Sequence, residues 1–121
     1  MTDDFRSSEI SVRGAEPADI ADMAKLLSTV FHRKDPPAVA TQFSAAKLED
    51  LALIFGGKSV REGLSMVAVS AATGKIVGAV LAHDFATPVP DEIARIDLDA
   101  EPVIALLDGI EDRFRASHDI V

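Results

Sequence analysis

The segment from Gly63 to Asp84 constrains the fold of this chain most strongly, because it combines two apolar strands with a glycine-containing turn. It reads GLSMVAVSAATGKIVGAVLAHD. Apolar side chains point to both faces of each strand, which is typical of a sheet covered on both sides. The loop around Gly74 suits a hairpin in which glycine takes a positive φ, and Gly78 indicates a bulge in the second strand. We therefore expect an antiparallel hairpin with helices on both faces of the sheet.

One more strand and three helices are expected around this hairpin. Apolar residues recur at helical spacing after Pro17 and after Pro102, while a Pro-Pro pair and a Gly-Gly pair mark helix ends. The predicted elements are a strand over 9–13 and helices over 17–34, 37–55 and 101–116. The order strand, helix, helix, strand, strand, helix predicts an α+β fold in residues 9–121. The polar residues 1–8 are predicted to be disordered.

The chain carries a net charge of −8, and that charge is concentrated at one end. Residues 84–121 hold 10 acidic and 3 basic side chains, whereas residues 1–83 hold 10 and 9. This balance lacks the basic footprint of a nucleic-acid-binding protein and favours a cationic partner. The sequence contains no cysteine, no signal-peptide pattern and no apolar run of membrane-spanning length. We therefore expect a cytoplasmic protein without nucleic-acid or membrane partners.

The segment VFHRKDPP, from Val30 to Pro37, places a carboxylate where an apolar helix ends. Turns at the ends of elements often carry functional groups, so Asp35 is a candidate functional residue. The position also suits a structural role, because an aspartate oxygen can cap the helix that follows. These residues alone leave both roles open. The histidines are scattered, and GGKS from Gly56 lacks the spacing of a phosphate loop, so neither a metal site nor a phosphate loop is predicted.

Three segments share their pattern with one protein family. The stretch ISVRGAEPADIADMAKLLSTVF is similar to the opening strand and first helix of that family. The stretch FHRKDPP is similar to a Phe-x-x-x-Glu-Pro pattern, with Asp35 standing where the family has glutamate. The hairpin shares a Ser-x-Val-Ala and a Thr-Gly-x-Ile-Val-Gly spacing. On these motifs the chain resembles the N-terminal, acceptor-side half of a GNAT-fold N-acetyltransferase, in the arylalkylamine N-acetyltransferase branch with its bacterial relatives.

The resemblance implies that acetyl-CoA donates an acetyl group to a primary amine, whose nitrogen must first lose a proton. Asp35 maps onto the carboxylate that the family uses for this proton transfer. The first two helices of the family border the acceptor pocket, which makes Phe31, Phe43 and Asp84 the expected substrate-binding residues. The family's cofactor loop, Arg/Gln-x-x-Gly-x-Gly/Ala at a helix N-terminus, does not occur in this sequence. The chain is therefore expected to lack the acetyl-CoA-binding half and to be inactive by itself.

In the complete fold, the strand over 76–83 would pair with a further strand. A bare apolar edge is a pairing hazard, so we expect it to bind a second copy of the chain or a complementing chain. The alternative is a small binding or regulatory module that dimerises through this edge and uses its acidic surface for a ligand. A stable dimer that binds a cationic ligand would favour that module over an acetyltransferase part.

Overall fold

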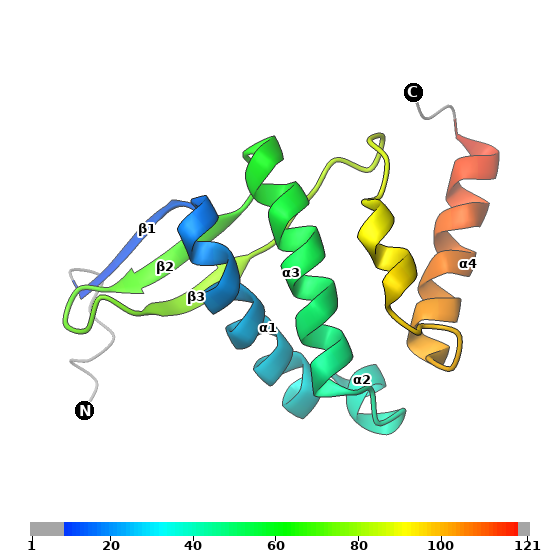
Figure 1. Ribbon diagram of the computed structural model, residues 1–121, viewed down its shortest axis with the longest axis horizontal. Helices are drawn as coiled ribbons and strands as arrows, with labels where there is room; N and C mark the ends of the chain where they lie inside the picture. The colour runs from blue at the N-terminus through cyan, green and yellow to red at the C-terminus, as the bar shows by residue number, and fades with distance from the viewer. Residues whose placement is uncertain (1–8, 119–121) are drawn as a thin grey trace.

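The computed structural model describes residues 9–118, which form an α+β arrangement of one sheet and four helices with two short 3₁₀ helices (Figure 1). The three strands are antiparallel in the order β1-β2-β3. The predicted α+β class and antiparallel hairpin are therefore confirmed, while the predicted disorder of residues 1–8 lies outside the described residues. The elements are β1 (Ile10–Gly14), η3 (Pro17–Asp19), α1 (Ile20–Lys34), α2 (Pro36–Ala40), α3 (Ala45–Glu62), β2 (Met66–Ser70), β3 (Ile76–Val80), η4 (Asp91–Arg95) and α4 (Pro102–Ser117).

The first helical segment begins at Pro17, as the sequence predicts. Pro17 opens the 3₁₀ helix that leads into α1, where its missing N–H costs no hydrogen bond. The side chain of Asp19 accepts from the N–H of Glu16 at 2.8 Å. Arg13, on β1, donates to the same carboxylate at 2.7 and 3.0 Å. The Arg13 hydrogen bonds, followed by that from Glu16, lower the pKa of Asp19 and tie β1 to the start of α1.

The predicted second helix, over 37–55, is two helices instead of one. Asp35 ends α1 and caps α2, because its Oδ2 accepts from the N–H of Ala38 at 3.1 Å. The chain then turns through Gln42, whose φ of 56° lies in the left-handed region. Ser44 starts α3 by accepting a backbone N–H of the first turn at 3.3 Å. The single-helix prediction is wrong because these polar caps compete with a continuous helix.

The predicted helix end at residues 56–57 is also wrong, because α3 continues past this Gly-Gly pair. Gly56 is buried and permits close packing: a Cβ there would lie 3.4 Å from Ile20 Cγ2 and 3.8 Å from Leu81 Cδ1. Gly63 ends the helix instead, with a φ of 71° that favours glycine. A glycine needed for packing and a glycine needed for a helix end look alike in one sequence.

A bulge lies in β3, next to the glycine that predicts it. Ala68 of β2 lies opposite Gly78, but the following residue, Val69, lies opposite Ile76. Val77 is therefore skipped in the ladder, and it is 50% exposed. The extra residue changes which face the neighbouring side chains occupy, so strict alternation fails as a guide at this point.

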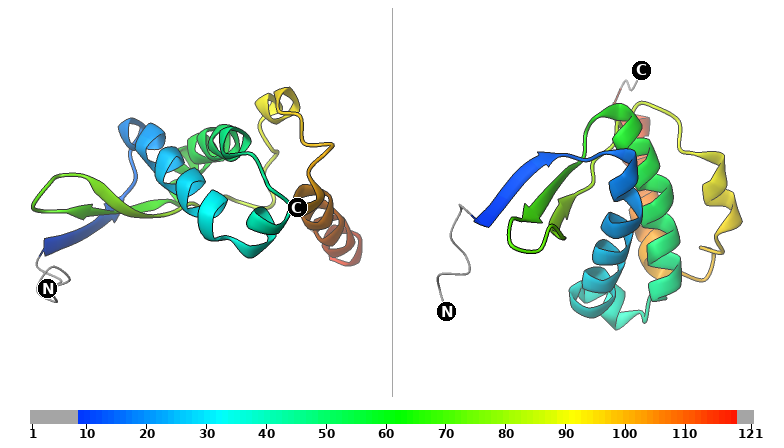
Figure 2. Two further views of the ribbon diagram at one scale, coloured as in Figure 1. Left: turned by 90° about the horizontal axis from the view of Figure 1, so that it is seen from below. Right: turned by 60° about the vertical axis from the view of Figure 1, so that its left-hand side comes forward.

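The helices cover one face of the sheet, so the prediction that both faces are covered is wrong. Helix α1 lies over that face with α3 at its side, near the end of β3, whereas α4 lies beyond the end of the sheet (Figure 2). On the opposite face, Val12 and Met66 are 64% and 46% exposed. We call these two residues the outer sheet face. Apolar side chains on both faces of the strands indicate that both faces are covered. They do not show whether the cover of the second face belongs to the same chain.

The core lies between α1, α3 and the covered face of the sheet. Its fully buried apolar residues come from α1, α2, the loop before α3 and β2. Truncation at these positions leaves a cavity that the surrounding structure fills only in part, so they are the most sensitive to substitution. They are Met23, Ala24, Ala38, Phe43 and Val67.

Helix α4 forms close to its predicted range, but it has no buried residue. Its N-terminal end is tied to α3 by the ion pair of Lys47 and Glu101, 3.3 Å apart. Near its C-terminal end, the guanidinium of Arg115 lies 3.9 Å from the ring centroid of Phe85 and donates to the Phe85 carbonyl at 2.6 Å. Phe114 also packs on Phe85, with 5.6 Å between ring centroids. These contacts hold α4 at its two ends.

Candidate functional site

An apolar cleft of about 530 Å³ lies between α1, α3 and the end of β3. Its walls are the apolar stripes of the two helices together with residues of β3 and of the chain just after it. A cavity of this size with few polar groups suits a small organic molecule. The lining residues are Leu27, Ser28, Phe31, Leu48, Leu51, Ala52, Phe55, Ala79, Val80, Leu81 and His83.

The helical periodicity of α1 and α3 explains this lining. Leu27 and Phe31 are four residues apart in α1, so their side chains lie on the same side of the helix. Leu51 and Phe55 repeat the spacing in α3. The apolar stripe of α1 is buried near the start of the helix, where Met23 is 1% exposed. Toward the end of the helix the same stripe borders the cleft, and Phe31 is 45% exposed.

One end of the cleft is polar, because His83 and the buried Lys58 meet there. The ring of His83 stacks on Phe55, with 4.9 Å between ring centroids. Its Nδ1 lies 3.1 Å from the Nζ of Lys58, which is 3% exposed. The same Nζ contacts Glu62 Oε2 at 3.0 Å and donates to the carbonyl oxygen of Asp84 at 2.8 Å. We call Lys58, Glu62, His83 and Asp84 the lysine cluster.

Glu62 holds the loop after β3 against the end of α3. Its Oε1 accepts from the N–H of Asp84 at 2.6 Å, and its Oε2 accepts from the hydroxyl of Thr87 at 2.6 Å. The bond from Asp84, then that from Thr87, and the neighbouring Lys58 favour the charged carboxylate and lower the pKa of Glu62 to about 2. Glu62 thereby holds the chain next to His83 in place at the mouth of the cleft.

Phe31 and Asp35, two of the predicted site residues, lie close to each other at the end of α1. Phe31 lines the cleft, and Asp35 follows by one helical turn, with its N–H donating to the Phe31 carbonyl at 3.1 Å. The Asp35 carboxylate accepts from Ala38, so the capping role that the sequence allowed is present in the structure. A catalytic role for the same carboxylate stays a prediction.

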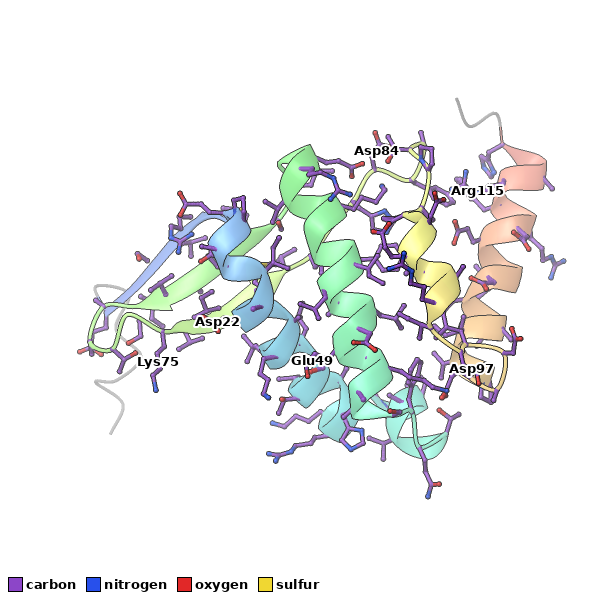
Figure 3. All side chains as sticks on the ribbon, viewed as in Figure 1. Asp22, Glu49, Lys75, Asp84, Asp97 and Arg115 are labelled. Atoms are coloured by element: carbon purple, nitrogen blue, oxygen red, sulfur yellow. The ribbon has the colours of Figure 1, made fainter. Side chains whose placement is uncertain are left out.

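Phe43 and Asp84, the other two predicted site residues, lie elsewhere. Phe43 is 2% exposed, so its side chain belongs to the core and does not line the cleft. Asp84 lies beside the C-terminal end of α3, where its Oδ1 accepts from the N–H of Ala86 at 2.9 Å (Figure 3). Asp35 precedes α2, at the other end of α3. The structure therefore does not bring Asp84 and Asp35 to one site.

The roles of Lys58 and Glu62 were not predicted from the sequence. Lys58 and Glu62 are four residues apart, which is a recognised signal for an ion pair on a helix. That signal was hidden because the helix was predicted to end before these residues. The position of His83 at the end of a strand favours a surface or site-lining group, and His83 does line the cleft. Only its contact with Lys58 left no local signal, since the two residues are 25 positions apart.

The helix that follows β3 does not fit the pyrophosphate of acetyl-CoA. A phosphate group needs free backbone N–H groups at a helix N-terminus. Helix α4 instead begins with Glu101 as its N-cap and with Pro102, which has no N–H. Asp97 and Asp99 come just before it in the sequence, and their charges would repel phosphate. Figure 3 shows Asp97 near the start of α4. No step through acetyl-CoA can therefore be assigned to these residues.

No family profile, curated protein or solved structure matches this chain. Within residues 9–118, no group of three or more His, Asp or Glu side chains converges as metal ligands. The helices of this part of the chain are all too short or too polar to cross a membrane, and a cytoplasmic location stays a prediction. The cleft and the lysine cluster are therefore the features from which a function is argued.

Proposed function

We propose that this chain is the acceptor-side part of a GNAT-type N-acetyltransferase, and that its cleft binds the carbon skeleton of a primary amine. The observation that carries the proposal is the position of the cleft between α1 and α3. In the family that the sequence resembles, the first two helices border the acceptor pocket. The volume and the aromatic lining of the cleft suit an arylalkyl group, and the order of strands and helices also supports the proposal.

In this proposal, the amino group of the ligand lies toward Phe31, one helical turn from Asp35. An amine attacks only as the free base, so a nearby carboxylate assists by accepting its proton, directly or through water. Acetyl-CoA does not fit the N-terminus of α4, so in this proposal the cofactor is bound by a part of the enzyme other than residues 9–118. The chain is accordingly proposed to bind the amine but to be inactive by itself.

Titration with phenethylamine tests amine binding. We expect the NMR signals of the methyl groups of Leu27 and Leu51 to shift as the cleft fills. Phe31→Ala removes an aromatic wall and should weaken binding about 10-fold. Val30→Ala is the matched control, because Val30 is equally exposed at 45% but does not line the cleft. Unshifted cleft signals at millimolar amine contradict the proposal.

Asp35→Asn separates the catalytic role of Asp35 from its capping role. Asparagine caps helices as well as aspartate does, so the free energy of unfolding should stay the same. In the enzyme completed with its cofactor-binding part, kcat should fall by about 100-fold or more. Asp35→Ala should lower kcat as well, and the lost cap should cost about 1 kcal/mol of stability. An unchanged kcat in Asp35→Asn leaves Asp35 with the capping role alone.

The outer edge of β3, which pairs with no other strand within residues 9–118, supports the alternative function, a dimerising binding module with an acidic ligand surface. β3 is an edge strand beside the outer sheet face, so a second copy of the chain can pair with it about a two-fold axis. Val80→Lys should then give monomers in light scattering. Val12→Lys, which is about equally exposed on the opposite edge strand, should leave the dimer intact. A monomeric native protein at tens of micromolar contradicts pairing through this edge.

A further inference from the structure

His83 gives one end of the cleft a defined hydrogen-bonding group. Its side chain lines the cleft, its ring stacks on Phe55, and its Nδ1 lies 3.1 Å from the Nζ of Lys58. The other polar side chain of the lining belongs to Ser28, whose hydroxyl already donates to the carbonyl oxygen of Lys25 at 3.1 Å. The imidazole is therefore the side chain of the lining that can still donate a hydrogen bond to a ligand.

Lys58 determines where the neutral imidazole carries its proton. An ammonium group has three N–H donors and no acceptor. Three groups around the Nζ of Lys58 can accept its three N–H bonds. They are the Glu62 carboxylate, with Oε1 at 3.3 Å and Oε2 at 3.0 Å, the Asp84 carbonyl oxygen at 2.8 Å and the Nδ1 of His83 at 3.1 Å. Because Nδ1 can only accept in this arrangement, the proton of the ring is on Nε2.

The Nε2–H of His83 is available to a ligand. Across residues 9–118 this nitrogen forms no hydrogen bond, and the side chain is exposed where it borders the cleft. A single donor at one end of an apolar cavity favours ligands that carry an acceptor at the matching end. The remaining walls offer apolar and aromatic contacts to the rest of the ligand.

We propose that the cleft binds a small aromatic carbonyl compound whose oxygen accepts a hydrogen bond from the Nε2–H of His83. The ring of the ligand lies among Phe31, Leu51 and Phe55, and the carbonyl group faces His83. Lys58 is a positioning residue, because it fixes the proton on the imidazole while remaining buried itself. This inference uses the same cleft as the proposed function, but it needs neither an amine nor an acetyl group.

Acetophenone and α-methylstyrene form a matched pair of probes for this inference. They have nearly the same shape, but only acetophenone carries an oxygen acceptor. Their dissociation constants are measured by NMR titration, and the ratio of the two cancels the contribution of the shared ring. His83→Phe keeps a ring against Phe55 and removes the donor. The dissociation constant of acetophenone, relative to that of α-methylstyrene, should therefore rise about 3- to 10-fold. The control His118→Phe, at an exposed histidine that ends α4, should leave the ratio unchanged.

Nitrogen-15 spectra of the histidine rings test the role of Lys58 directly. In the native protein we expect the signals of His83 to show a protonated Nε2 and a bare Nδ1. In Lys58→Met this preference should weaken, and the ratio for the two probes should move toward that of His83→Phe. A native His83 protonated on Nδ1 overturns the inference, and this measurement needs no variant that might fail to fold.

The outcomes separate this inference from the proposed function. If phenethylamine binds but the probe ratio is the same in the native protein and in His83→Phe, the inference is overturned and the proposed function stands. If the ratio shifts as expected and no amine binds, the inference stands and the proposed function falls. If neither kind of ligand binds, both are overturned.

Discussion

Helices α1 and α4 carry similar apolar stripes in very different surroundings. In α1, Met23 and Ala24 are 1% and 0% exposed, because α1 packs against α3 and the sheet. In α4, Leu106 and Ile110 are 62% and 58% exposed. A stripe of helical period therefore predicts that a helix forms, while the surface against which it packs decides how far that helix stabilises the protein.

The two regions also differ in the contacts that hold them. Helices α1 and α3 share one core, whereas α4 is tied down by the Lys47–Glu101 ion pair and by Arg115 on Phe85. The Lys47–Glu101 pair is partly buried, so the cost of desolvating its charges offsets much of their attraction. A single cation–π contact contributes about 1 kcal/mol or less. We therefore expect the α1–α3 region to determine global stability and α4 to open locally.

The largest effect should come from the core between α1 and α3. Phe43→Ala empties a fully buried position and should lower the free energy of unfolding by about 3–5 kcal/mol in urea denaturation. Leu106→Ala on α4 should change it by less than about 0.5 kcal/mol. Equal losses at the two positions would show that α4 packs as tightly as the core does.

Overpacking the same interface should have the next largest effect. Gly56→Val places atoms where a Cβ already lies 3.4 Å from Ile20, and this should cost about 1–3 kcal/mol of unfolding free energy. Gly57→Ala is the control, because its Cβ meets only the flexible end of Arg61 at 3.3 Å. That variant should gain up to about 1 kcal/mol in helix propensity. A stable Gly56→Val would mean that α1 and α3 are loosely packed.

Local signals predicted the elements well and their packing poorly. Pro17 marks the start of the first helical segment because a missing N–H matters within a single turn. The predicted helix end at Gly56 is wrong because glycine is needed there for close packing against Ile20, a contact that exists only in the folded chain. Lys58 and His83, which form the polar end of the cleft, are 25 residues apart in the sequence. No local sequence pattern extends over that separation. The prediction that helices cover the second face of the sheet is also wrong. The apolar pattern of a strand indicates that something covers it, but not whether that cover belongs to the same chain.

The lysine cluster should be visible through the pH dependence of stability. The pKa of Glu62 falls from an ordinary 4.5 to about 2 in the folded protein. The stability that its charge contributes is therefore fully present above pH 4.5 and is lost as the pH falls through 2. Glu62→Gln should be less stable than the native protein at pH 7, and this difference should shrink between about pH 5 and pH 2.

Urea denaturation across this pH range measures the effect, and Asp50→Asn, at an exposed position of the same helix, controls for the loss of one acidic group. A difference between Glu62→Gln and the native protein that does not change with pH would mean that the Glu62 charge contributes nothing to the fold.

The smallest global effect should come from the contact that holds the end of α4. Arg115→Ala removes the cation–π contact and the bond to the Phe85 carbonyl, and should lower the free energy of unfolding by about 1 kcal/mol or less. Hydrogen exchange should quicken in α4 while the amides of α1 and α3 keep their native rates. Faster exchange throughout the chain would contradict the independence of the two regions.

The pairing of β1 with β2 has a consequence for the order of folding. Ile10 lies opposite Ser70, so this pairing closes a loop that contains α1, α2 and α3, whereas β2 and β3 are joined by a short turn. Closing a long loop costs more entropy before any contact compensates for it. We expect β1 to join last, so Val12→Ala should speed unfolding and leave the refolding rate unchanged in stopped-flow measurements.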